Sequence, residues 1–292
     1  MRILTDDDAL ALTPAEAVAA MREALLAHER GEYHSPPRLS LNVGDVRLIL
    51  GAGGDGERGV GLRVAGPANA PLEHLTVTWT PQGAIDAVIV GNEIGARRTG
   101  AVAAVAADLL ARPGALRVGL LGSGRNGWAQ IWGLTGAREV AALSVFSPNP
   151  AHREAFAARA RDELSLDAVA VGSAREATDA MDVVILCTTS REPVIEADWV
   201  APRAHVTSIG AKTTSAHEAP AELLVRTRRV VSDAPDDLTS PLSELAGLPL
   251  VALGRLLGEG VPARGDDEVS LFLYCGLGGA DAAYGQAVAR RG

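Results

Sequence analysis

The sequence predicts an α/β protein in which an α+β part is combined with a Rossmann-type doubly wound parallel sheet. Three observations support this fold class. Residues 38–90 contain short β-branched segments separated by Gly and Pro, the pattern of an antiparallel meander. Residues 116–265 alternate apolar strands, turns and helices, as in a parallel sheet covered on both faces. A glycine-rich turn, Gly122 to Gly127, directly follows the first strand of this second part.

The first part is predicted to begin and end with a helix. Thr13 and Glu16 form a capping box, and an amphipathic pattern continues to about residue 30. An Ala-rich helix is expected over residues 92–111, because Pro113 and Gly114 then stop it. Between the two helices we expect the strands of the meander at residues 38–43, 46–50, 60–64, 75–80 and 85–90.

The second part repeats a strand, a turn and a helix. Strands are expected at residues 117–121, 143–147, 169–171, 183–188, 205–209 and 230–233. Helices are expected at residues 126–137, 151–163 and 174–180. A last amphipathic helix, predicted over residues 268–290, need not belong to the parallel sheet.

Composition and charge narrow the classes of function. The 292 residues are 47% apolar and 22% charged, enough for two globular cores. The net charge of -9 argues against a nucleic-acid partner, which would need a concentrated basic face. We expect no membrane span, because no apolar run is long enough, and no secretory signal at the start. The expected protein is cytoplasmic, with a small molecule as its ligand.

Metal binding is not expected. The two cysteines, Cys187 and Cys275, stand far apart in apolar stretches, so each reads as a buried thiol. The six histidines show no metal-ligand spacing on a shared helix.

Lysine usage is unusual. Of 27 basic residues, 26 are Arg and only Lys212 is Lys. Lysine can lose its proton at an accessible pH, whereas arginine cannot. Lys212 is therefore a candidate for proton transfer, although a single lysine could also have escaped a general bias toward arginine.

The glycine turn is predicted to bind a dinucleotide. Gly122 permits a tight turn, Gly124 lets a pyrophosphate approach the backbone, and Gly127 lets the helix pack closely on the strand. The N–H groups at the helix start, at Arg125 and Asn126, then face the phosphates together with the positive end of the helix dipole.

The end of the second strand favours NADP over NAD. An NAD site usually carries Asp or Glu about 20 residues beyond the glycines, whereas an NADP site replaces the acid and adds a cation. Here no acid is present, and Ser147, Asn149 and Arg153 are candidates to hold a 2′-phosphate. Arg153 could equally be a solvated helix charge. Thr188 and Thr189 end a later strand and could line the nicotinamide, or simply mark the exit from the strand.

Several segments together resemble the ornithine cyclodeaminase/mu-crystallin family over essentially the whole chain. They lie in the order and at the spacing typical of that family: Arg98-Thr99-Gly100-Ala101, the glycine turn, Ser208-Ile209-Gly210-Ala211, and Asp267-Glu268-Val269-Ser270-Leu271-Phe272 before Gly276 and Asp281.

The resemblance implies a domain organisation and a substrate. Residues 1–115 and 266–292 would form a substrate-binding and dimerisation domain of a homodimer, and residues 116–265 a Rossmann NAD(P)-binding domain. Arg38 and Arg98 match positions that hold a substrate carboxylate, for which a guanidinium is well suited. Arg97 is an alternative that the sequence leaves open. Ile209 and Gly210 end the strand that contributes to the cofactor site.

Two departures from the family pattern affect the expected chemistry. Arg63 replaces a usual Lys and can bind a carboxylate but cannot readily shuttle a proton. Lys212 stands where cyclodeaminases carry a catalytic Asp, at a strand end where ligands bind in open α/β sheets. A further family acid is missing from residues 48–51. Glu218 could pair with Lys212, but capping of the next helix is the preferred interpretation.

These features favour an NAD(P)H-dependent reductase, or the reverse dehydrogenase, of a small imino or 2-keto acid. In this hypothesis Arg38, Arg63 and Arg98 hold acidic groups of the substrate and Lys212 donates the proton. A cyclodeaminase-type lyase that uses bound NAD+ on a basic amino acid is one alternative. A non-catalytic, mu-crystallin-like NADP-binding protein is the other.

Overall fold

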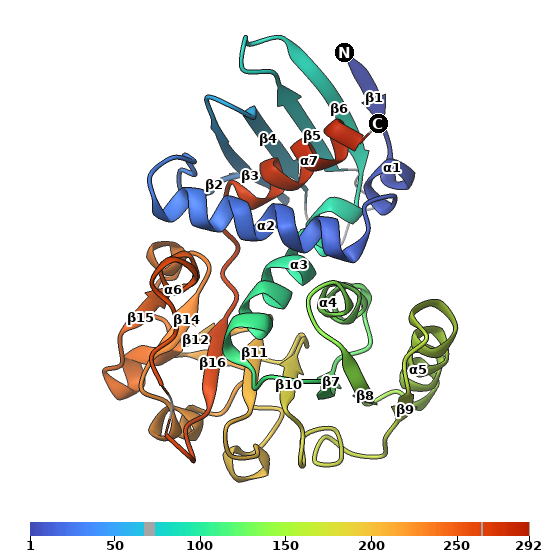
Figure 1. Cartoon of the computed structure of the whole chain (residues 1–292), viewed down its shortest axis with the longest axis vertical. Helices are drawn as coiled ribbons and strands as arrows, with labels where there is room; N and C mark the ends of the chain where they lie inside the picture. Colours follow the sequence, from blue (N-terminus) through green and yellow to red (C-terminus); the bar gives the residue numbers. More distant parts are fainter. Residues whose placement is uncertain (67–73, 264, 292) are drawn as a thin grey trace.

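The computed structural model describes residues 1–66, 74–263 and 265–291, which form two large sheets with helices between them (Figure 1). The first sheet has six strands in the order β1-β6-β5-β4-β3-β2. Strand β1 is parallel to β6, and the other neighbours are antiparallel, so the predicted meander is confirmed. The strands are β1 Arg2–Leu4, β2 Leu39–Val43, β3 Val46–Asp55, β4 Gly59–Ala65, β5 His74–Trp79 and β6 Ile85–Gly91.

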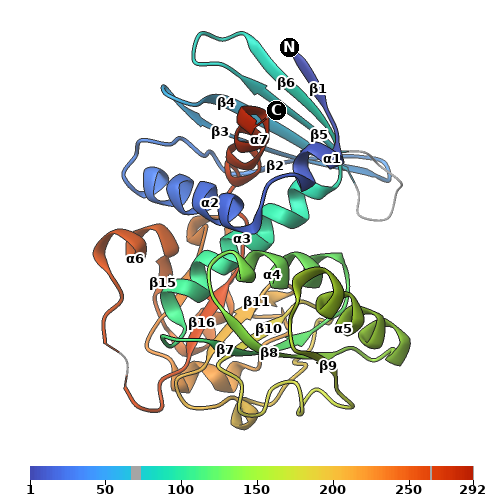
Figure 2. The ribbon, with the colours of Figure 1, turned by 45° about the vertical axis from the view of Figure 1, so that its right-hand side comes forward.

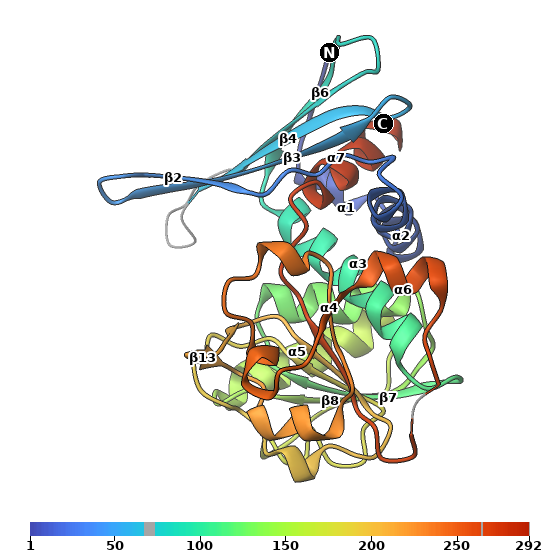
Figure 3. The ribbon, with the colours of Figure 1, turned by 90° about the vertical axis from the view of Figure 1, so that its left-hand side faces the viewer.

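Three helices lie on one side of the first sheet: α1 (Asp6–Leu10), α2 (Pro14–Glu29) and α7 (Ala280–Arg291) (Figure 3). The α2 helix begins with the predicted capping box of Thr13 and Glu16. Glycines bring α7 close to the sheet, because a Cβ at Gly61 would stand only 2.7 Å from the Cβ of Ala282. A Cβ at Gly53 would likewise stand 2.6 Å from the Cα of Gly279. The start of α7 therefore rests directly on β3 and β4.

Helix α3 (Glu93–Leu110) is buried along most of its length and runs between the two sheets (Figures 1 and 2). It crosses α4 (Arg125–Thr135) at two glycines. A Cβ at Gly100 would overlap the carbonyl oxygen of Ala129, and a Cβ at Gly133 would stand 2.6 Å from the carbonyl oxygen of Gly100. The two helix backbones are thus in direct contact.

The second sheet is parallel throughout and has eight strands in the order β15-β14-β16-β11-β10-β7-β8-β9, which confirms the predicted α/β class. The strands are β7 Leu116–Leu121, β8 Val140–Phe146, β9 Ala168–Ala170, β10 Val183–Leu186, β11 His205–Ser208, β14 Val230–Ser232, β15 Leu250–Ala252 and β16 Ser270–Leu273. A short hairpin, β12 (Lys212–Thr213) with β13 (Ala216–His217), follows β11.

Alternate side chains of the second sheet enter two different cores. Val183 and Ile185 pack with α4 and with α5 (Pro150–Leu164), whereas Val184 and Leu186 pack on the opposite face. That face is covered by the 3-10 helices η1 (Ala197–Trp199), η2 (Ala221–Arg226) and η4 (Leu242–Ala246), not by α-helices. Such burial on both faces explains why these strands are continuously apolar.

Two predicted helices are wrong. Residues 174–180 form turns, in which Ala180 takes a positive φ of 57° that ends any helical path. The stretch 268–290 is not one helix but strand β16 followed by α7. Short apolar runs such as Ser270–Leu273 cannot be assigned from periodicity alone, and this one pairs between β11 and β14.

Strand β16 consequently belongs to the parallel sheet, and only α7 from the end of the chain packs on the first sheet. In the predicted division, residues 266–292 belong to the substrate-binding domain. Helix α7 fits that division, but β16 pairs with strands of the predicted nucleotide-binding domain. The sequence patterns also missed β1, α1, β15 and the short helix α6 (Leu253–Glu259). Among the described helices, none combines the length and apolar character that a membrane span would need.

Candidate functional site

The glycine turn has the geometry that the dinucleotide pattern predicts. Gly122 has a φ of +111°, and a Cβ there would overlap the carbonyl oxygen of Cys187 at the end of β10. A Cβ at Gly127 would overlap the carbonyl oxygen of Gly122, so this glycine allows α4 to pack closely on the turn. Gly124, in contrast, faces open space on an exposed part of the turn. The turn therefore leaves space for a ligand beside Gly124, the glycine whose backbone a pyrophosphate is expected to approach.

The start of α4 offers free backbone donors. Arg125, Asn126 and Gly127 are its first three residues, and the first intrahelical bond runs from the N–H of Trp128 to the carbonyl of Gly124 at 3.0 Å. Arg125 and Asn126 are exposed. These residues fit the pyrophosphate of a dinucleotide.

At the end of β8, the candidate cofactor residues Ser147 and Arg153 are joined by hydrogen bonds. The Ser123 hydroxyl donates to the Ser147 hydroxyl at 2.9 Å, and Nη1 of Arg153 donates to the Ser147 carbonyl at 2.9 Å. The side chain of Asn149 caps α5 by accepting from the N–H of Ala151 at 3.0 Å. Asn149 thus has a structural role that its position in the sequence did not reveal.

The three arginines named from the sequence meet around one carboxylate, Asp281 in the first turn of α7. Nε of Arg98 lies 2.7 Å from Oδ1 of Asp281, and Nη1 of Arg63 lies 3.0 Å from the same oxygen. Nη2 of Arg38 lies 3.4 Å from Oδ2. The arginines come from the segment before β2, from β4 and from α3, so Asp281 joins three separate parts of the fold.

The arginine cluster carries a net positive charge and has buried N–H groups that are not hydrogen-bonded. Burial alone would raise the pKa of Asp281, but Arg98 first, and then Arg63 and Arg38, hold it well below its usual range. Burial lowers the pKa of Arg98 to about 10 in spite of the neighbouring carboxylate. Nη1 of Arg98 and Nε of Arg63 are buried without a hydrogen-bond partner. Three guanidiniums around one carboxylate can bind a second carboxylate.

Lys212 is the first residue of the short strand β12, which follows β11. Its Nζ donates to the carbonyl of Ile209 at 3.0 Å, just beyond the end of β11. Burial lowers the pKa of Lys212, while Cys275, Glu218 and Asp233 act in the opposite direction. The lowered pKa is therefore caused by burial and not by neighbouring arginines.

Asp233 connects Lys212 to the arginine cluster. Its buried carboxylate follows β14 and accepts from the backbone N–H groups of Cys275, Gly276 and Leu277 at 2.7 to 3.1 Å. A Cβ at Gly276 would stand 2.8 Å from Nη1 and Nη2 of Arg38, so this glycine lies against the guanidinium. One short segment is thus in contact with Arg38 on one side and close to Lys212 on the other.

Glu218 is fully buried and does not cap a helix, so the preferred interpretation of this residue was wrong. Its Oε2 accepts from the N–H and hydroxyl of Thr188 at 2.9 and 2.7 Å. Its Oε1 accepts from the Ser208 hydroxyl at 2.9 Å and from the N–H of Gly210 at 2.5 Å. Glu218 therefore holds the ends of β10 and β11 together. Thr189, next along the chain, is exposed.

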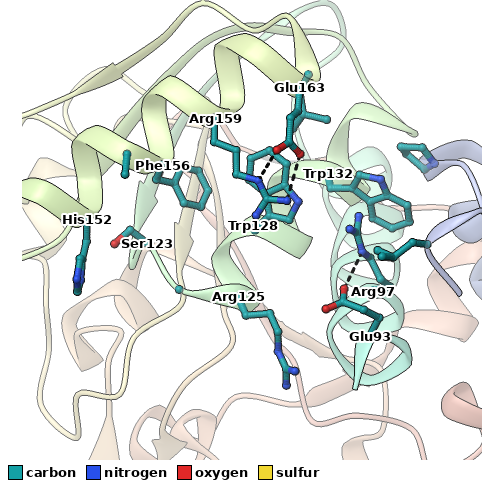
Figure 4. A pocket seen from close by; sticks show the side chains of 15 residues that line it. Glu93, Arg97, Ser123, Arg125, Trp128, Trp132, His152, Phe156, Arg159 and Glu163 are labelled. Atoms are coloured by element: carbon teal, nitrogen blue, oxygen red, sulfur yellow. Dashed lines mark hydrogen bonds and ion pairs between the residues drawn. The ribbon is translucent and has the colours of Figure 1, made fainter. Parts of the chain in front are cut away.

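A hollow of about 1180 Å³ is lined by the glycine turn at Ser123, Gly124 and Arg125 and extends along α4 to α3 and α5 (Figure 4). Four of its charged side chains are paired, Arg159 with Glu163 at 2.9 Å and Arg97 with Glu93 at 3.2 Å. Each of these guanidiniums also covers an indole: Arg159 covers Trp128 at 3.7 Å, and Arg97 covers Trp132 at 4.3 Å. Arg97 is thus occupied outside the arginine cluster, while Arg125 extends away from these pairs (Figure 4).

The structure assigns roles that the sequence did not. In the sequence, Asp281 was noted only as part of a family motif. Asp233 was noted only as the last residue of a predicted strand, and this position at a strand end was the signal that could have indicated its role. His74, which no motif indicated, contacts Nη2 of Arg63 through Nδ1 at 2.8 Å. Among the described residues, no group of three or more His, Cys, Asp or Glu side chains is arranged to hold a metal ion.

We expect Asp281→Asn to lower the free energy of unfolding at pH 7 by about 3 to 5 kcal/mol, because it leaves buried guanidiniums without their anion. The folded-state pKa lies below the unfolded value of about 3.9, so Asp281 stabilises the fold above that pH. This stabilisation is lost as the pH falls through the folded-state pKa. Denaturant titrations at pH 7 and pH 3 should therefore show a smaller difference between variant and parent at pH 3.

The control is Asp86→Asn, which removes a half-exposed pair with Arg2 and should cost less than about 1 kcal/mol. Equal stability of the Asp281→Asn and Asp86→Asn proteins at pH 7 would contradict the role of Asp281.

Comparison with known proteins agrees with this geometry. The model of the ornithine cyclodeaminase/mu-crystallin family matches residues 67–289. An NAD(P)H-dependent anabolic L-arginine dehydrogenase of Pseudomonas aeruginosa is 41% identical over 127 residues, which are 44% of this chain and only 39% of that protein. An iminosuccinate reductase of Paracoccus denitrificans is 26% identical over 295 residues, 95% of this chain and 92% of that protein.

The fold is shared with a solved structure of Thermococcus litoralis Δ1-pyrroline-2-carboxylate reductase in complex with NADH and L-proline. The TM-score is 0.88 at 24% identity, and the match covers 100% of this chain and 97% of that chain. The segment matched by the family model contains the glycine turn, Arg98, Lys212 and Asp281. The chain therefore belongs to the ornithine cyclodeaminase/mu-crystallin family.

Proposed function

We propose that this protein is an NAD(P)H-dependent reductase, or the reverse dehydrogenase, of a small imino or 2-keto acid. The observation that carries the proposal is the arginine cluster of Arg38, Arg63 and Arg98 around Asp281. Arg38 lies against Gly276, and the adjacent Cys275 is close enough to Lys212 to influence its pKa. His74 bonds to Arg63 and is also within the electrostatic influence of Arg125 at the start of α4. Similar proteins that are named as reductases or dehydrogenases of imino and amino acids support the same reaction class.

The arginine cluster would hold the substrate carboxylate. Three guanidiniums and one carboxylate leave two positive charges, and Arg63 and Arg98 retain buried N–H groups without partners. A carboxylate satisfies such groups with charge-assisted bonds, which also fix the orientation of the substrate.

The cofactor would lie across the glycine turn and the strand ends that follow β10 and β11. Gly124, Arg125 and Asn126 would hold the pyrophosphate, and Thr188, Thr189, Ile209 and Gly210 would border the nicotinamide. When bound, the reduced nicotinamide supplies the hydride. Glu218 fixes Thr188 and Gly210 and so keeps this border in place.

Lys212 would supply the proton for the substrate nitrogen or oxygen. A proton donor works best when its pKa is near the working pH, and burial moves Lys212 in that direction. Its contact with the Ile209 carbonyl holds the ammonium at the strand end. Arginine could not replace it, because a guanidinium does not release its proton.

Cyclodeamination is the less favoured reaction. It asks for carboxylates that hold and deprotonate a diamino acid, but residues 48–51 contain no acid and Lys212 replaces the family Asp. Gly51 leaves no space for a side chain, since a Cβ there would stand 2.7 Å from the carbonyl oxygen of Gly278.

We expect purified protein to oxidise NADPH with members of a panel of 2-keto acids, offered with and without ammonia or amines. Lys212→Arg should lower kcat at least about a hundredfold, as expected for loss of a general acid. The matched control is Arg255→Lys on the exposed surface of α6, which should leave kcat unchanged. Full turnover by Lys212→Arg would refute the assigned role, and ammonia release from a basic amino acid without added cofactor would favour the lyase. Tight cofactor binding without turnover of any substrate would favour the non-catalytic binder.

We further propose that NADP is preferred to NAD. The end of β8 carries no carboxylate that would repel a 2′-phosphate, and Arg153 is held there by the Ser147 carbonyl. The hydroxyl pair of Ser123 and Ser147 adds further hydrogen-bonding groups.

Arg153→Met should weaken NADPH binding about tenfold and leave NADH binding nearly unchanged, because one charge-assisted contact to the 2′-phosphate is lost. Titration of nicotinamide fluorescence measures both affinities. Arg161→Met on the same helix is the control, since Arg161 bonds to the Ala168 carbonyl near the opposite end of α5. An equal loss of affinity for both cofactors in Arg153→Met would argue against the preference.

The partner that we propose is a second copy of this chain. The described helices of the first part lie on one side of the first sheet (Figure 3). The side chains on its other face are predominantly apolar. On that face the register places Leu62 opposite Val77, and Val77 opposite Val88. Val60 is 52% and Leu75 38% exposed. A contiguous apolar sheet face of this kind is typical of a protein interface.

Leu62→Glu should convert a dimer into a monomer, because the interface would have to bury an unpaired charge. Sedimentation velocity should show that the dimer of the parent dissociates at concentrations at least about a hundredfold lower than those at which the dimer of the variant dissociates. Val225→Glu, at an 85% exposed position in η2, is the control and should remain dimeric. A monomeric parent protein, or a dimeric Leu62→Glu, would contradict the proposal.

A further inference from the structure

His74 is the one histidine that touches the arginine cluster in the part of the chain that the structure describes. It is the first residue of β5 and is paired with Gly91 of β6. Residues alternate between the two faces of a strand, so His74 shares the face of Thr76 and Thr78. Those two side chains contact the position of Gly285 in α7. His74 therefore lies on the side of the sheet that carries Asp281.

The contact with Arg63 determines the state of the imidazole. Nη2 of Arg63 lies 2.8 Å from Nδ1 of His74, while Nη1 of Arg63 lies 3.0 Å from Oδ1 of Asp281. A guanidinium can only donate hydrogen bonds, so Nδ1 must be the acceptor. The ring is consequently neutral, with its proton on Nε2. In a protonated ring Nδ1 would carry a proton, and the bond to Arg63 would be lost.

Charges from four elements act on this imidazole. Burial lowers the pKa of His74, and Arg63 of β4 and Arg125 of α4 lower it further. Asp281 of α7 and Asp6 of α1 act in the opposite direction. The balance favours the neutral ring, which is the form that the hydrogen bond requires.

The guanidinium of Arg63 is held at both of its terminal nitrogens, by an anion on one side and by a neutral acceptor on the other. Its buried Nε has no partner. Gly95 of α3 leaves space for this arrangement, because a Cβ there would stand 2.6 Å from Nη2 of Arg63. With a second carboxylate in place of His74, the cluster would carry less positive charge and would attract an acidic substrate less strongly.

We propose that His74 is a positioning residue for substrate binding: its neutral imidazole orients Arg63 toward the substrate carboxylate without neutralising it. This inference rests on the proposed function for the nature of the bound group, but the hydrogen bond and tautomer can be tested without turnover. His74 would thus contribute to selectivity for an acidic substrate through Arg63, without contacting the substrate itself.

The first test uses the full-length protein without substrate. Nitrogen-15 NMR of the imidazoles, with the His74 signals identified by their loss in His74→Asn, should show a neutral ring protonated on Nε2 at pH 7. Its titration should lie below pH 6.5, the ordinary value for histidine. In Arg63→Met the titration should move upward, because a neighbouring cation is removed. A ring protonated on Nδ1 at pH 7 would overturn the proposal even if the enzyme reduces keto acids.

The second test uses the best substrate from the keto acid and amine panel. His74→Ala should raise KM about tenfold and change kcat less than about threefold, as expected when a ground-state contact loses its orientation. His74→Asn should restore KM, because its side-chain oxygen can accept from Arg63 in place of Nδ1. His34→Asn, at an exposed position before β2, is the control and should match the parent.

The two tests separate failure of this inference from failure of the proposed function. If no substrate is turned over, the proposed function fails and the tautomer measurement still decides the state of His74. If turnover is found, an unchanged KM in His74→Ala, or a failure of His74→Asn to restore KM, refutes the positioning role and leaves the proposed function intact.

Discussion

The buried carboxylate of Asp281 is the interaction on which the arrangement of the first part depends. It takes donors from the segment before β2, from β4 and from α3, which are separate in the sequence. Without an anion, three guanidiniums at this depth would repel one another and lose their hydration. The glycines of β3 and β4 serve the same arrangement, because larger residues would keep α7 and its Asp281 away from the sheet.

Buried carboxylates also organise the second part, but they do so by accepting from the backbone. Asp233 holds the segment after β16, and Glu218 holds the segments after β10 and β11. All of these segments leave the carboxyl ends of parallel strands, where loops would otherwise have unpaired N–H groups. The proposed site therefore lies between two sets of loops and side chains that are fixed by acids, and its own ligand groups are predominantly basic.

The sequence predicted features that depend on neighbours in the chain and missed those that depend on contacts made by folding. The glycine turn, the capping box at Thr13 and the alternating strands are local patterns, and each was found in the structure. Arg38, Arg63 and Arg98 were named through the family resemblance, and the structure brings them together. Their common partner Asp281, however, is more than 180 residues away from each of them. Strand β16 was missed for the same reason, since its neighbours β11 and β14 come from earlier in the chain.

The direct backbone contact between α3 and α4 has a mechanical consequence. Arg98 is on α3 and the glycine turn leads into α4, while Gly100 and Gly133 leave no side chain between the two helix backbones at the point where they cross. A pair of helices packed in this way resists sliding and rotation, because no flexible side chain separates the backbones at the crossing and could absorb the movement. The spacing between Arg98, which we propose to bind the substrate carboxylate, and the glycine turn, which we propose to bind the pyrophosphate, is thus built into a rigid unit. Substrates would be sorted by their length against this constant separation, and an opening motion would have to occur in the segments around it.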